Sequence, residues 1–316
     1  MSGSKRIGLL FSSAQIDYNL DPRWVADIPD ISVGDEVFSD GCGLISKRLA
    51  VQLSKRKQII YRGARYTPTV FQIRSVIIYY HGSSALKLFA RYLGYKGVLM
   101  LHPDLDAKGQ HLAQFRKSMK KFNTTADHSF SVVGHSKPYS FGRLNNDIIV
   151  LLSSLGVTDT ALLAKQQEYF EWISAASKDP VKALDFLACL ESFQLAERAL
   201  LEGVESEKVK AEIKRLQNME VVGSRNAQTN KFKSRMIIHK SRRLYGVCDP
   251  FQVLQEGEVH IRITVSRKGH TTPIHGDVII VRNPCLHPGM SIIPTASQTI
   301  TNVFRRYPQV KGCPPS

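Results

Sequence analysis

The spacing of apolar residues changes twice along the chain. Up to residue 146 they fall in short runs bounded by Gly, Pro and Asp, the pattern of β-strands joined by turns. From 147 to 222 they recur at helical spacing, and from 223 to 316 short strand-like runs return. The pattern predicts an α+β protein in which a helical insert, 147–222, lies between a first β region, 1–146, and a second, 223–316.

Stop and start signals divide the helical insert. Gly156 ends one helix, Asp159 is placed to cap the next, and Asp179-Pro180 supplies an N-cap and a first helical residue. The apolar stripes of these helices predict a packed core and no chemistry. Long helices are expected at Ala161–Ser177, Ala183–Phe193 and Glu205–Met219, and shorter ones in the first β region at Lys47–Leu53 and His111–Phe122.

The most informative stretch is 278–289. Val278–Val281 is a run of four β-branched residues that ends at a breaker, which predicts a buried strand leaving its sheet. The loop that follows carries Arg282 and His287 on backbone stiffened by two prolines. Stiff loops at strand ends often hold binding or catalytic groups, although a solvated surface turn is the alternative.

The composition is that of a folded protein with an excess of positive charge. Lys and Arg number 43 against 27 Asp and Glu, which gives a net charge of +16. Such a balance favours a polyanionic partner such as nucleic acid, and an unrelated basic protein is the alternative. No apolar run is long enough for a membrane helix, and the first residues do not form a signal peptide. The five cysteines are widely spaced without a C-x-x-C pair, which argues against zinc and predicts reduced thiols in the nucleus or cytoplasm.

Basic residues concentrate where carboxylates are missing. No Asp or Glu occurs between Asp40 and Asp104. We therefore predict contact with nucleic-acid phosphates there and in a later basic segment, with an ordinary solvated face as the alternative. The predicted nucleic-acid-binding residues are Lys47, Arg48, Arg56, Lys57, Arg62, Arg74, Lys240 and Arg242.

Two short motifs in the same region carry further chemistry. Gly94 and Gly97 flank Lys96, which lets the backbone approach a bulky ligand, while an exposed hairpin lysine is the alternative. Asp104 and Asp106 stand two positions apart, a spacing that could hold Mg²⁺. A turn is favoured for these two carboxylates because Asp and Pro are ordinary turn formers.

Several blocks, taken in order, resemble one family. Asp27-Ile-Pro-Asp30, Ser39-Asp-Gly-Cys-Gly43, Gly94-Tyr-Lys-Gly-Val98, Gln114–Phe122 and Arg282–Gly289 are the blocks concerned. These motifs resemble those of the eukaryotic RNA-directed RNA polymerases of RNA silencing, with the fungal members as the expected source. The resemblance covers most of 5–145 and 223–289.

The resemblance implies a polymerase core of two double-psi β-barrels with a helical region between them. This chain would hold the first barrel and the start of the second, and the full enzyme would copy an RNA template into double-stranded RNA from nucleoside triphosphates. Lys96 would neutralise phosphate charge and Arg282 would face the ribose hydroxyls of the nucleotide. Mg²⁺ is the implied cofactor, used in the two-metal manner. RNA, nucleotides and proteins of the silencing pathway are the implied partners.

The sequence also departs from the family. Ser75–Arg91 separates two segments that normally follow each other directly, and we interpret it as translated intron sequence. No Asp-x-Asp-Gly-Asp metal loop occurs, and Arg305–Ser316 resembles the stretch that precedes it. The metal ligands are therefore expected after Ser316, and this chain alone is expected to be inactive. A non-catalytic RNA-binding remnant is the alternative function.

Overall fold

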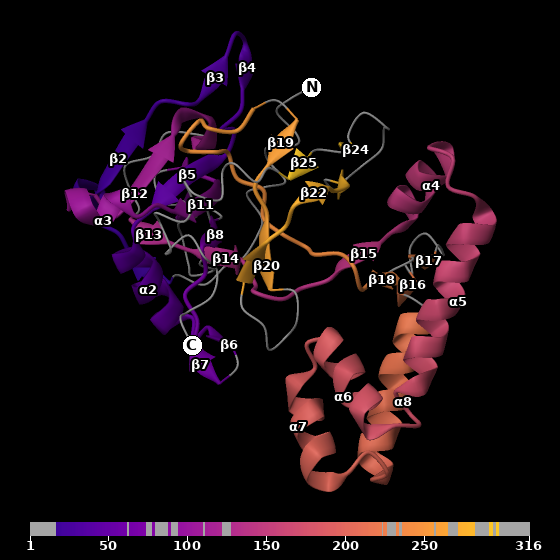
Figure 1. The fold of residues 1–316 in the computed structure, drawn as a ribbon. Coiled ribbons are helices and arrows are strands. Elements are labelled where there is room, and N and C mark those ends of the chain that lie inside the picture. Colours follow the sequence, from indigo (N-terminus) through magenta and orange to yellow (C-terminus); the bar gives the residue numbers. More distant parts are fainter. Residues whose placement is uncertain are drawn as a thin grey trace. The chain divides into compact units, whose positions relative to one another are not determined.

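The chain forms two compact units, each built from segments distant in sequence. In the computed structural model, unit 1 comprises Met1–Tyr139, Leu244–Gly276 and Ala296–Ser316, and unit 2 comprises Ser140–Arg243 and Asp277–Thr295 (Figure 1). The structure describes residues 17–61, 63–73, 78–79, 88–89, 94–109, 111–121, 128–222, 224–225, 232–233, 236–255, 257–264, 271–281, 291–292 and 295–296.

A six-stranded mixed sheet organises unit 1. Its strand order is β14-β8-β11-β5-β12-β2. Two pairs are parallel, β11 with β5 and β12 with β2, whereas β11–β8, β12–β5 and β14–β8 are antiparallel. Parallel neighbours need long crossover connections, so the first β region is not a simple meander. The strands are β2 (Val25–Ile28), β5 (Cys42–Ile45), β8 (Val70–Ile73), β11 (Gly97–Leu101), β12 (Ala113–Arg116) and β14 (Val132–His135).

Helix α2 (Lys47–Arg56) covers the apolar face of this sheet. Ser46 caps its N-terminus by accepting from the Leu49 N–H at 3.2 Å. Leu49 and Leu53 are fully buried in the same hydrophobic cluster as Phe71, Leu99 and Phe115 of the strands. The basic residues of α2 therefore lie on the side of the helix that faces away from this core.

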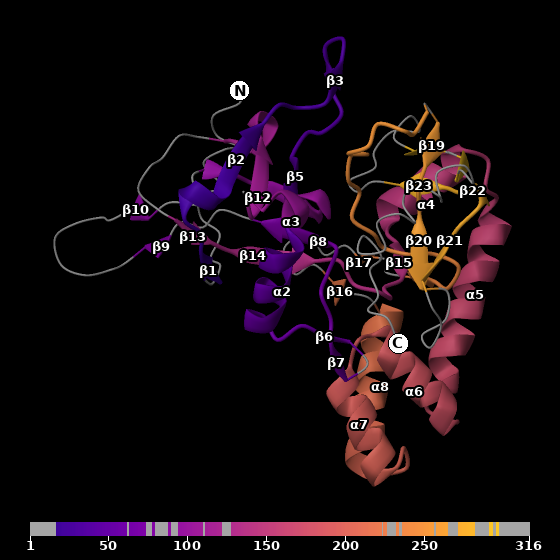
Figure 2. The same ribbon diagram turned by 60° about the vertical axis from the view of Figure 1, so that its left-hand side comes forward.

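Short strand pairs and turns complete unit 1. The β3–β4 hairpin stands clear of the sheet in both views, and Val33 at its tip is 71% exposed (Figure 2). The pairs are β1 (Tyr18–Asn19) with β13 (Ser129–Phe130), β3 (Ser32–Val33) with β4 (Glu36–Val37), β6 (Ile60–Tyr61) with β7 (Ala64–Arg65), β9 (Ile78–Tyr79) with β10 (Leu88–Phe89), and β20 (Arg262–Thr264) with β21 (Thr271–Pro273). The remaining elements of unit 1 are η2 (Pro22–Trp24), α3 (Asp104–Lys108), η4 (Lys117–Met119) and β19 (Glu258–Val259). Two short strands, β22 (Gly276–Asp277) and β25 (Thr295–Ala296), each have one residue in either unit.

Unit 2 is mainly helical. Helix α5 packs against α6 and α8, and α7 packs against the same two helices. Phe186, Leu187 and Ile213 form the centre of its core, to which Met236 and Ile237 of β18 also belong. The helices are α4 (Asn146–Ser154), α5 (Asp159–Ala175), α6 (Pro180–Cys189), α7 (Phe193–Glu202) and α8 (Glu207–Val222); the strand pairs are β15 (Gly142–Leu144) with β18 (Met236–Ile238), β16 (Ser224–Arg225) with β17 (Phe232–Lys233), and β23 (Ile280–Val281) with β24 (Ser291–Ile292).

A buried polar contact ties the first strand of unit 2 to its helices. Glu220 of α8 accepts from the Tyr169 hydroxyl at 2.5 Å and pairs with Arg143 of β15 at 2.7 Å. Burial, followed by the hydrogen bond to Glu220, raises the pKa of Tyr169, so the phenol stays protonated and remains a donor.

The helix expected at His111–Phe122 is wrong. Residues 113–116 form strand β12, which pairs with β2 and β5, and 117–119 form a single 3₁₀ turn. Ala113 and Phe115 point into the core, so an alternating pattern was present among residues that are individually good helix formers. Pairing with β2 and β5 therefore outweighed the local helix propensity of these residues.

Smaller differences concern element boundaries. Thr158, not Asp159, caps α5, because its hydroxyl accepts from the Ala161 N–H at 3.3 Å. The helix expected at 183–193 is α6, which ends at Cys189, and a further helix, α7, begins at Phe193. The buried strand expected at 278–281 is only the half-buried β23, and Ile279 beside it is 66% exposed because neither hydrophobic cluster covers it.

The segment at 75–91 joins two strands that already meet. Ile73, at the end of β8, pairs directly with Gly97, at the start of β11. This is the antiparallel neighbour relation that a short turn would produce. Of the inserted segment, only the paired residues 78–79 and 88–89 lie within the described residues.

Candidate functional site

Two glycine turns meet backbone to backbone at the start of β11. Gly97 has φ +157°, and a Cβ at this position would lie 2.1 Å from the Gly41 carbonyl oxygen. The next residue, Val98, donates its N–H to that same oxygen at 2.8 Å. Only glycine permits this approach, so the 39–43 and 94–97 turns are locked together.

Lys96 immediately precedes Gly97 of this contact, and hydrogen bonds to the 117–121 turn hold its backbone. Its N–H donates to the Met119 carbonyl at 2.9 Å, and the Lys121 N–H donates to the Gly94 carbonyl at 2.9 Å. The neighbouring Tyr95 is 3% exposed, and its ring stacks on Phe115 with 4.4 Å between centroids. The Lys96 side chain therefore starts from a backbone that is fixed on both sides.

Three further lysines occupy the turn that holds Lys96. Lys117, Lys120 and Lys121 are all exposed, and with Lys96 we call them the lysine cluster. The Lys120 ammonium lies 5.4 Å from the centroid of the Tyr95 ring, and the Lys121 ammonium donates to the Ser118 carbonyl at 2.6 Å. Tyr95 itself donates its hydroxyl to Asp27, and burial followed by this bond raises its pKa. The cluster can meet phosphate groups while the tyrosine remains neutral.

Asp30 lies beneath these turns and accepts three hydrogen bonds. Ser118 donates its hydroxyl to Oδ1 at 2.6 Å and its N–H to Oδ2 at 2.9 Å, and the Ser39 hydroxyl donates to Oδ1 at 2.9 Å. Burial acts to raise the pKa of Asp30, but these bonds and the nearby charge of Arg116 outweigh it, so the pKa lies below its ordinary value. The carboxylate is therefore ionised at neutral pH.

A segment from after the helical insert crosses the same end of the sheet. Gln72, Val98 and Cys42 are aligned across β8, β11 and β5. The Tyr245 hydroxyl donates to Gln72 Oε1 at 3.2 Å. Burial raises the pKa of the Cys42 thiol above its ordinary value, and a hydrogen bond from the Cys248 backbone partly opposes this rise. Three extended residues span about 10 Å, the width of two strand spacings, so 245–248 lies across this row.

Two of the predicted RNA-binding residues, Lys47 and Arg48, begin α2 just beyond the other end of β5. Lys96 adjoins the start of β5 and Lys47 follows its end, so a four-residue strand, about 13 Å, separates them. The Lys47 and Arg48 N–H groups donate to the Asp106 carboxylate at 2.6 and 3.1 Å. Asp106 therefore caps α2 from outside the helix, which is a structural use of a group considered for Mg²⁺.

Two other predicted RNA-binding residues, Arg56 and Lys57, contact Asp17, a residue that the sequence did not associate with them. The Lys57 ammonium lies 2.9 Å from Asp17 Oδ1, and the Asp17 side chain is 6% exposed. Arg56 donates to the Asp17 carbonyl at 3.0 Å and its guanidinium lies over the Tyr18 ring. Lys57 thus neutralises a buried charge, which leaves less of its own charge for an external phosphate.

The remaining predicted site residues are not brought to Lys96 by the described structure. Lys240 is exposed in unit 2, and Arg242 there donates to the Ser241 carbonyl at 2.8 Å and lies over the Phe141 ring. Arg62, Arg74 and Arg282 lie outside the described residues.

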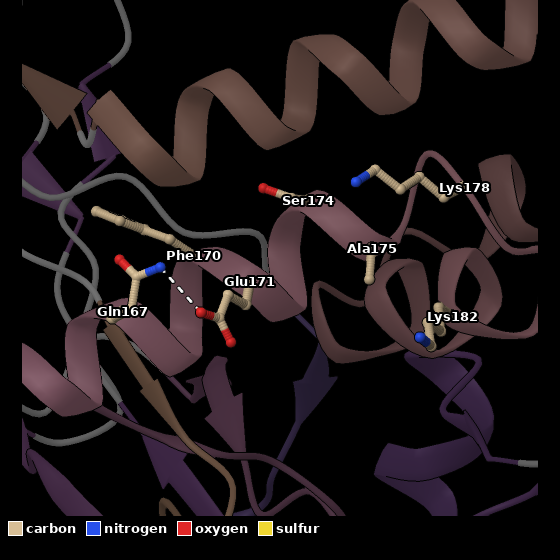
Figure 3. Close-up of a pocket in the computed structure, with 7 residues that line it drawn as sticks. All are labelled: Gln167, Phe170, Glu171, Ser174, Ala175, Lys178 and Lys182. Atoms are coloured by element: carbon tan, nitrogen blue, oxygen red, sulfur yellow. Dashed lines mark hydrogen bonds between the residues drawn. The ribbon is translucent and has the colours of Figure 1, made fainter.

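An open groove of about 370 Å³ lies on unit 2, along α5 and the start of α6. Figure 3 shows Lys178 and Lys182 at one end and Gln167 donating to Glu171 at the other, at 2.9 Å. None of the predicted site residues lines this groove. The structure therefore gives it no part in the predicted chemistry.

The described residues do not fit a metal ion. Nowhere among them do three or more His, Cys, Asp or Glu side chains gather as a metal would require. In the same part of the chain, no helix combines the length and apolar character that crossing a membrane demands.

Sequence reasoning quoted Asp30 and Ser118 within motifs but gave them no role. They stand 88 residues apart, and no spacing rule connects them. The three exposed lysines of the cluster lie in the stretch expected to be a helix, His111–Phe122, and likewise received no role. The one signal in the sequence for a shared role was that the Asp-Ile-Pro-Asp and Ser-Met-x-Lys blocks are both among the motifs that resemble the family.

Comparison with known proteins gives a consistent result. The chain is 33% identical over 293 residues to probable RNA-dependent RNA polymerase 1 of Oryza sativa subsp. japonica, covering 90% of this chain and 35% of that protein. It is 31% identical over 295 residues to RNA-dependent RNA polymerase 1 of Arabidopsis thaliana, covering 90% of this chain and 24% of that one. The chain thus spans about a third or less of the length of these relatives.

A solved structure shares the fold. RNA dependent RNA polymerase QDE-1 from Thielavia terrestris superposes with a TM-score of 0.61 at 17% identity, covering 95% of this chain and 34% of that chain. The likeness supports the α+β arrangement of sheet and helices. The sequence profile described as RNA dependent RNA polymerase matches residues 3–290, nearly the whole chain. The family expected from the sequence is thereby confirmed: this chain belongs to the RNA-dependent RNA polymerases.

Proposed function

We propose that this chain forms part of the core of an RNA-directed RNA polymerase of RNA silencing, which joins nucleotides on an RNA template to make double-stranded RNA. The observation that carries the proposal is the locked glycine contact, which fixes Lys96 at the start of β11, an inner strand of the sheet. Membership of the family supports the reaction class, and the basic lysine cluster supports a phosphate-bearing ligand.

The sheet of unit 1 is proposed to be the first double-psi β-barrel. Its two parallel pairs are nested in the chain, because β5 and β11 both lie between β2 and β12. Each parallel pair needs a long crossover connection, a feature that such a barrel also requires. The residues from 223 onward are proposed to begin the second barrel, with the helices of 147–222 between the two.

Lys96 is proposed to neutralise triphosphate or product phosphate charge. A cation on a fixed backbone needs little reorganisation when the charge appears, which is the basis of electrostatic stabilisation in active sites. Lys117, Lys120 and Lys121 would add attraction for the RNA backbone. Arg282 is proposed, from the family resemblance, to face the ribose hydroxyls.

The RNA template and nucleoside triphosphates are the proposed partners, together with proteins of the silencing pathway, in the nucleus or cytoplasm. Mg²⁺ is the proposed cofactor of the complete enzyme. Because the described residues offer no ligand set for it, its carboxylates are proposed to lie elsewhere in that enzyme.

The test is binding of a fluorescent nucleoside triphosphate and of a short single-stranded RNA to the purified chain. Lys96→Ala should weaken triphosphate affinity by about 10- to 100-fold, the effect of losing one charge-assisted hydrogen bond. Lys214→Ala, on the exposed face of α8, removes the same charge and is the matched control. Equal affinities of the two variants would refute the role of Lys96.

A further inference from the structure

A ring of hydrogen bonds runs from Asp30 to the backbone on both sides of Lys96. We propose that Asp30 is a positioning residue for Lys96, acting through Ser118 and Ser39. The proposal deepens the proposed function, because it concerns how the same lysine is held.

The first arm of the ring reaches the Lys96 amide. Ser118 gives Asp30 two donors, its hydroxyl at 2.6 Å and its N–H at 2.9 Å, which fix the centre of the η4 turn. The next residue, Met119, then presents its carbonyl to the Lys96 N–H at 2.9 Å. A shift of Ser118 therefore moves the acceptor on which Lys96 rests.

The second arm reaches the amide that follows Gly97. The Ser39 hydroxyl donates to Asp30 at 2.9 Å and accepts from the Ile31 N–H at 2.8 Å, which fixes the start of the 39–43 turn. In that turn, the Gly41 carbonyl accepts from the Val98 N–H at 2.8 Å. The Gly41 N–H donates to the Ser118 hydroxyl at 3.2 Å and closes the ring between the two arms.

The chemistry of the ring requires a carboxylate. Oδ1 accepts from two hydroxyls and Oδ2 accepts from an N–H, so neither oxygen can be replaced by a donor. An Asn at position 30 would turn its NH₂ either toward the Ser118 N–H or toward hydroxyls that already accept from Ile31 and Gly41. Asp30→Asn therefore breaks the ring at almost constant side-chain volume.

The first experiment measures hydrogen exchange of individual amides in the whole chain. Asp30→Asn should speed exchange at Lys96 and Val98 by about tenfold or more. The Leu101 amide, which donates to Thr69 at 2.8 Å at the other end of β11, should keep its rate. Asp35→Asn, which removes an exposed carboxylate between β3 and β4, is the control. No change at Lys96 and Val98, or the same acceleration at Leu101, would overturn the proposal.

A second pair of variants keeps the test decisive if Asp30→Asn does not fold. Ser118→Ala removes the hydroxyl that joins both arms, and Ser118→Thr keeps it. Selective acceleration in the Ala variant with recovery in the Thr variant supports the proposal. Acceleration in both variants, or in neither, would count against it.

A double-mutant cycle on triphosphate binding separates this proposal from the proposed function. Asp30→Asn should lower affinity severalfold in the chain with Lys96 and leave it unchanged in Lys96→Ala. An equal loss in both backgrounds would show that Asp30 does not act through Lys96. Selective exchange at Lys96 with no effect of Lys96→Ala on binding would support the anchoring and refute the proposed function.

Discussion

The glycine contact at the start of β11 and helix α2 use positive charge in different ways. At the glycine contact, Lys96 is fixed by backbone hydrogen bonds and the other lysines of the cluster are exposed. At α2, Asp106 caps the helix N-terminus, and Lys57, just beyond the last helical residue, pairs with the buried Asp17. The basic residues around α2 thus stabilise the fold, whereas the lysine cluster is proposed to meet an external anion. A cation's role depends on which carboxylates the fold brings to it.

The largest expected effect is at the glycine contact itself. Gly97→Ala should destabilise unit 1 by about 4 kcal/mol or prevent its folding, because the new Cβ would overlap the Gly41 carbonyl at a positive φ. Gly63→Ala is the matched control, since Gly63 also has a positive φ, +73°, but nothing lies within 4 Å of its Cβ position. It should cost about 1 kcal/mol. Urea unfolding measures both, and equal losses would mean that the glycine contact is not locked.

The next effect is at α2. Lys57→Met should destabilise by about 2 kcal/mol, because it leaves the Asp17 carboxylate buried without its partner. Lys55→Met, on the exposed side of the same helix, should change stability little. Adding Asp17→Asn to Lys57→Met should reduce the effect of the lysine change. If Lys57→Met and Lys55→Met unfold alike, the α2 cations are not structural and the comparison fails.

The Asp17 and Asp106 contacts also show where sequence reasoning stops. The stretch between Asp40 and Asp104 lacks carboxylates in sequence, but in space Asp17 and Asp106 supply them from either side. Charge patterning along a chain cannot reveal such partners, because they arrive through tertiary contacts.

The features that could be predicted were those that depend on residues close together in the sequence. Sequence motifs identified the polymerase family, and the spacing of apolar residues identified an α+β chain with helices between 146 and 222. The 113–116 strand could not be predicted, because helix-forming residues were drawn into a sheet by β2 and β5. The role of Asp30 depends on Ser118, a partner 88 residues away, so only the fold reveals it.

Salt dependence of RNA binding sharpens the comparison further. Changing Lys117, Lys120 and Lys121 together to Gln should reduce the log–log slope by about 2, at roughly 0.7 for each phosphate contact on a single strand. Changing Arg56, Lys57 and Arg62 to Gln, which the sequence alone predicts to lower the slope, should lower it less, because Lys57 already pairs with Asp17.

The control for this titration removes the same charge from unit 2. Lys178, Lys182 and Lys214 are exposed there, and their joint change to Gln should leave the slope nearly unaltered. A slope that falls equally in all three triple variants would show that binding depends on total charge and that neither the lysine cluster nor the α2 cations bind RNA selectively.

The smallest expected effect is a pH dependence of the glycine contact. The folded-state pKa of Asp30 lies below its ordinary value, so the unfolded chain binds a proton there more readily than the folded chain does. The contribution of the Asp30 ring to stability is therefore fully present above the unfolded pKa, about 3.9, and is lost as pH falls through the folded pKa. The difference in unfolding free energy between the wild-type chain and Asp30→Asn should be constant near neutral pH and shrink below about pH 4. Urea unfolding at a series of pH values measures this difference, with Asp35→Asn as the control for loss of one exposed carboxylate. A difference that stayed constant down to pH 3, or grew on acidification, would mean that the charge of Asp30 does not hold the turns around Lys96.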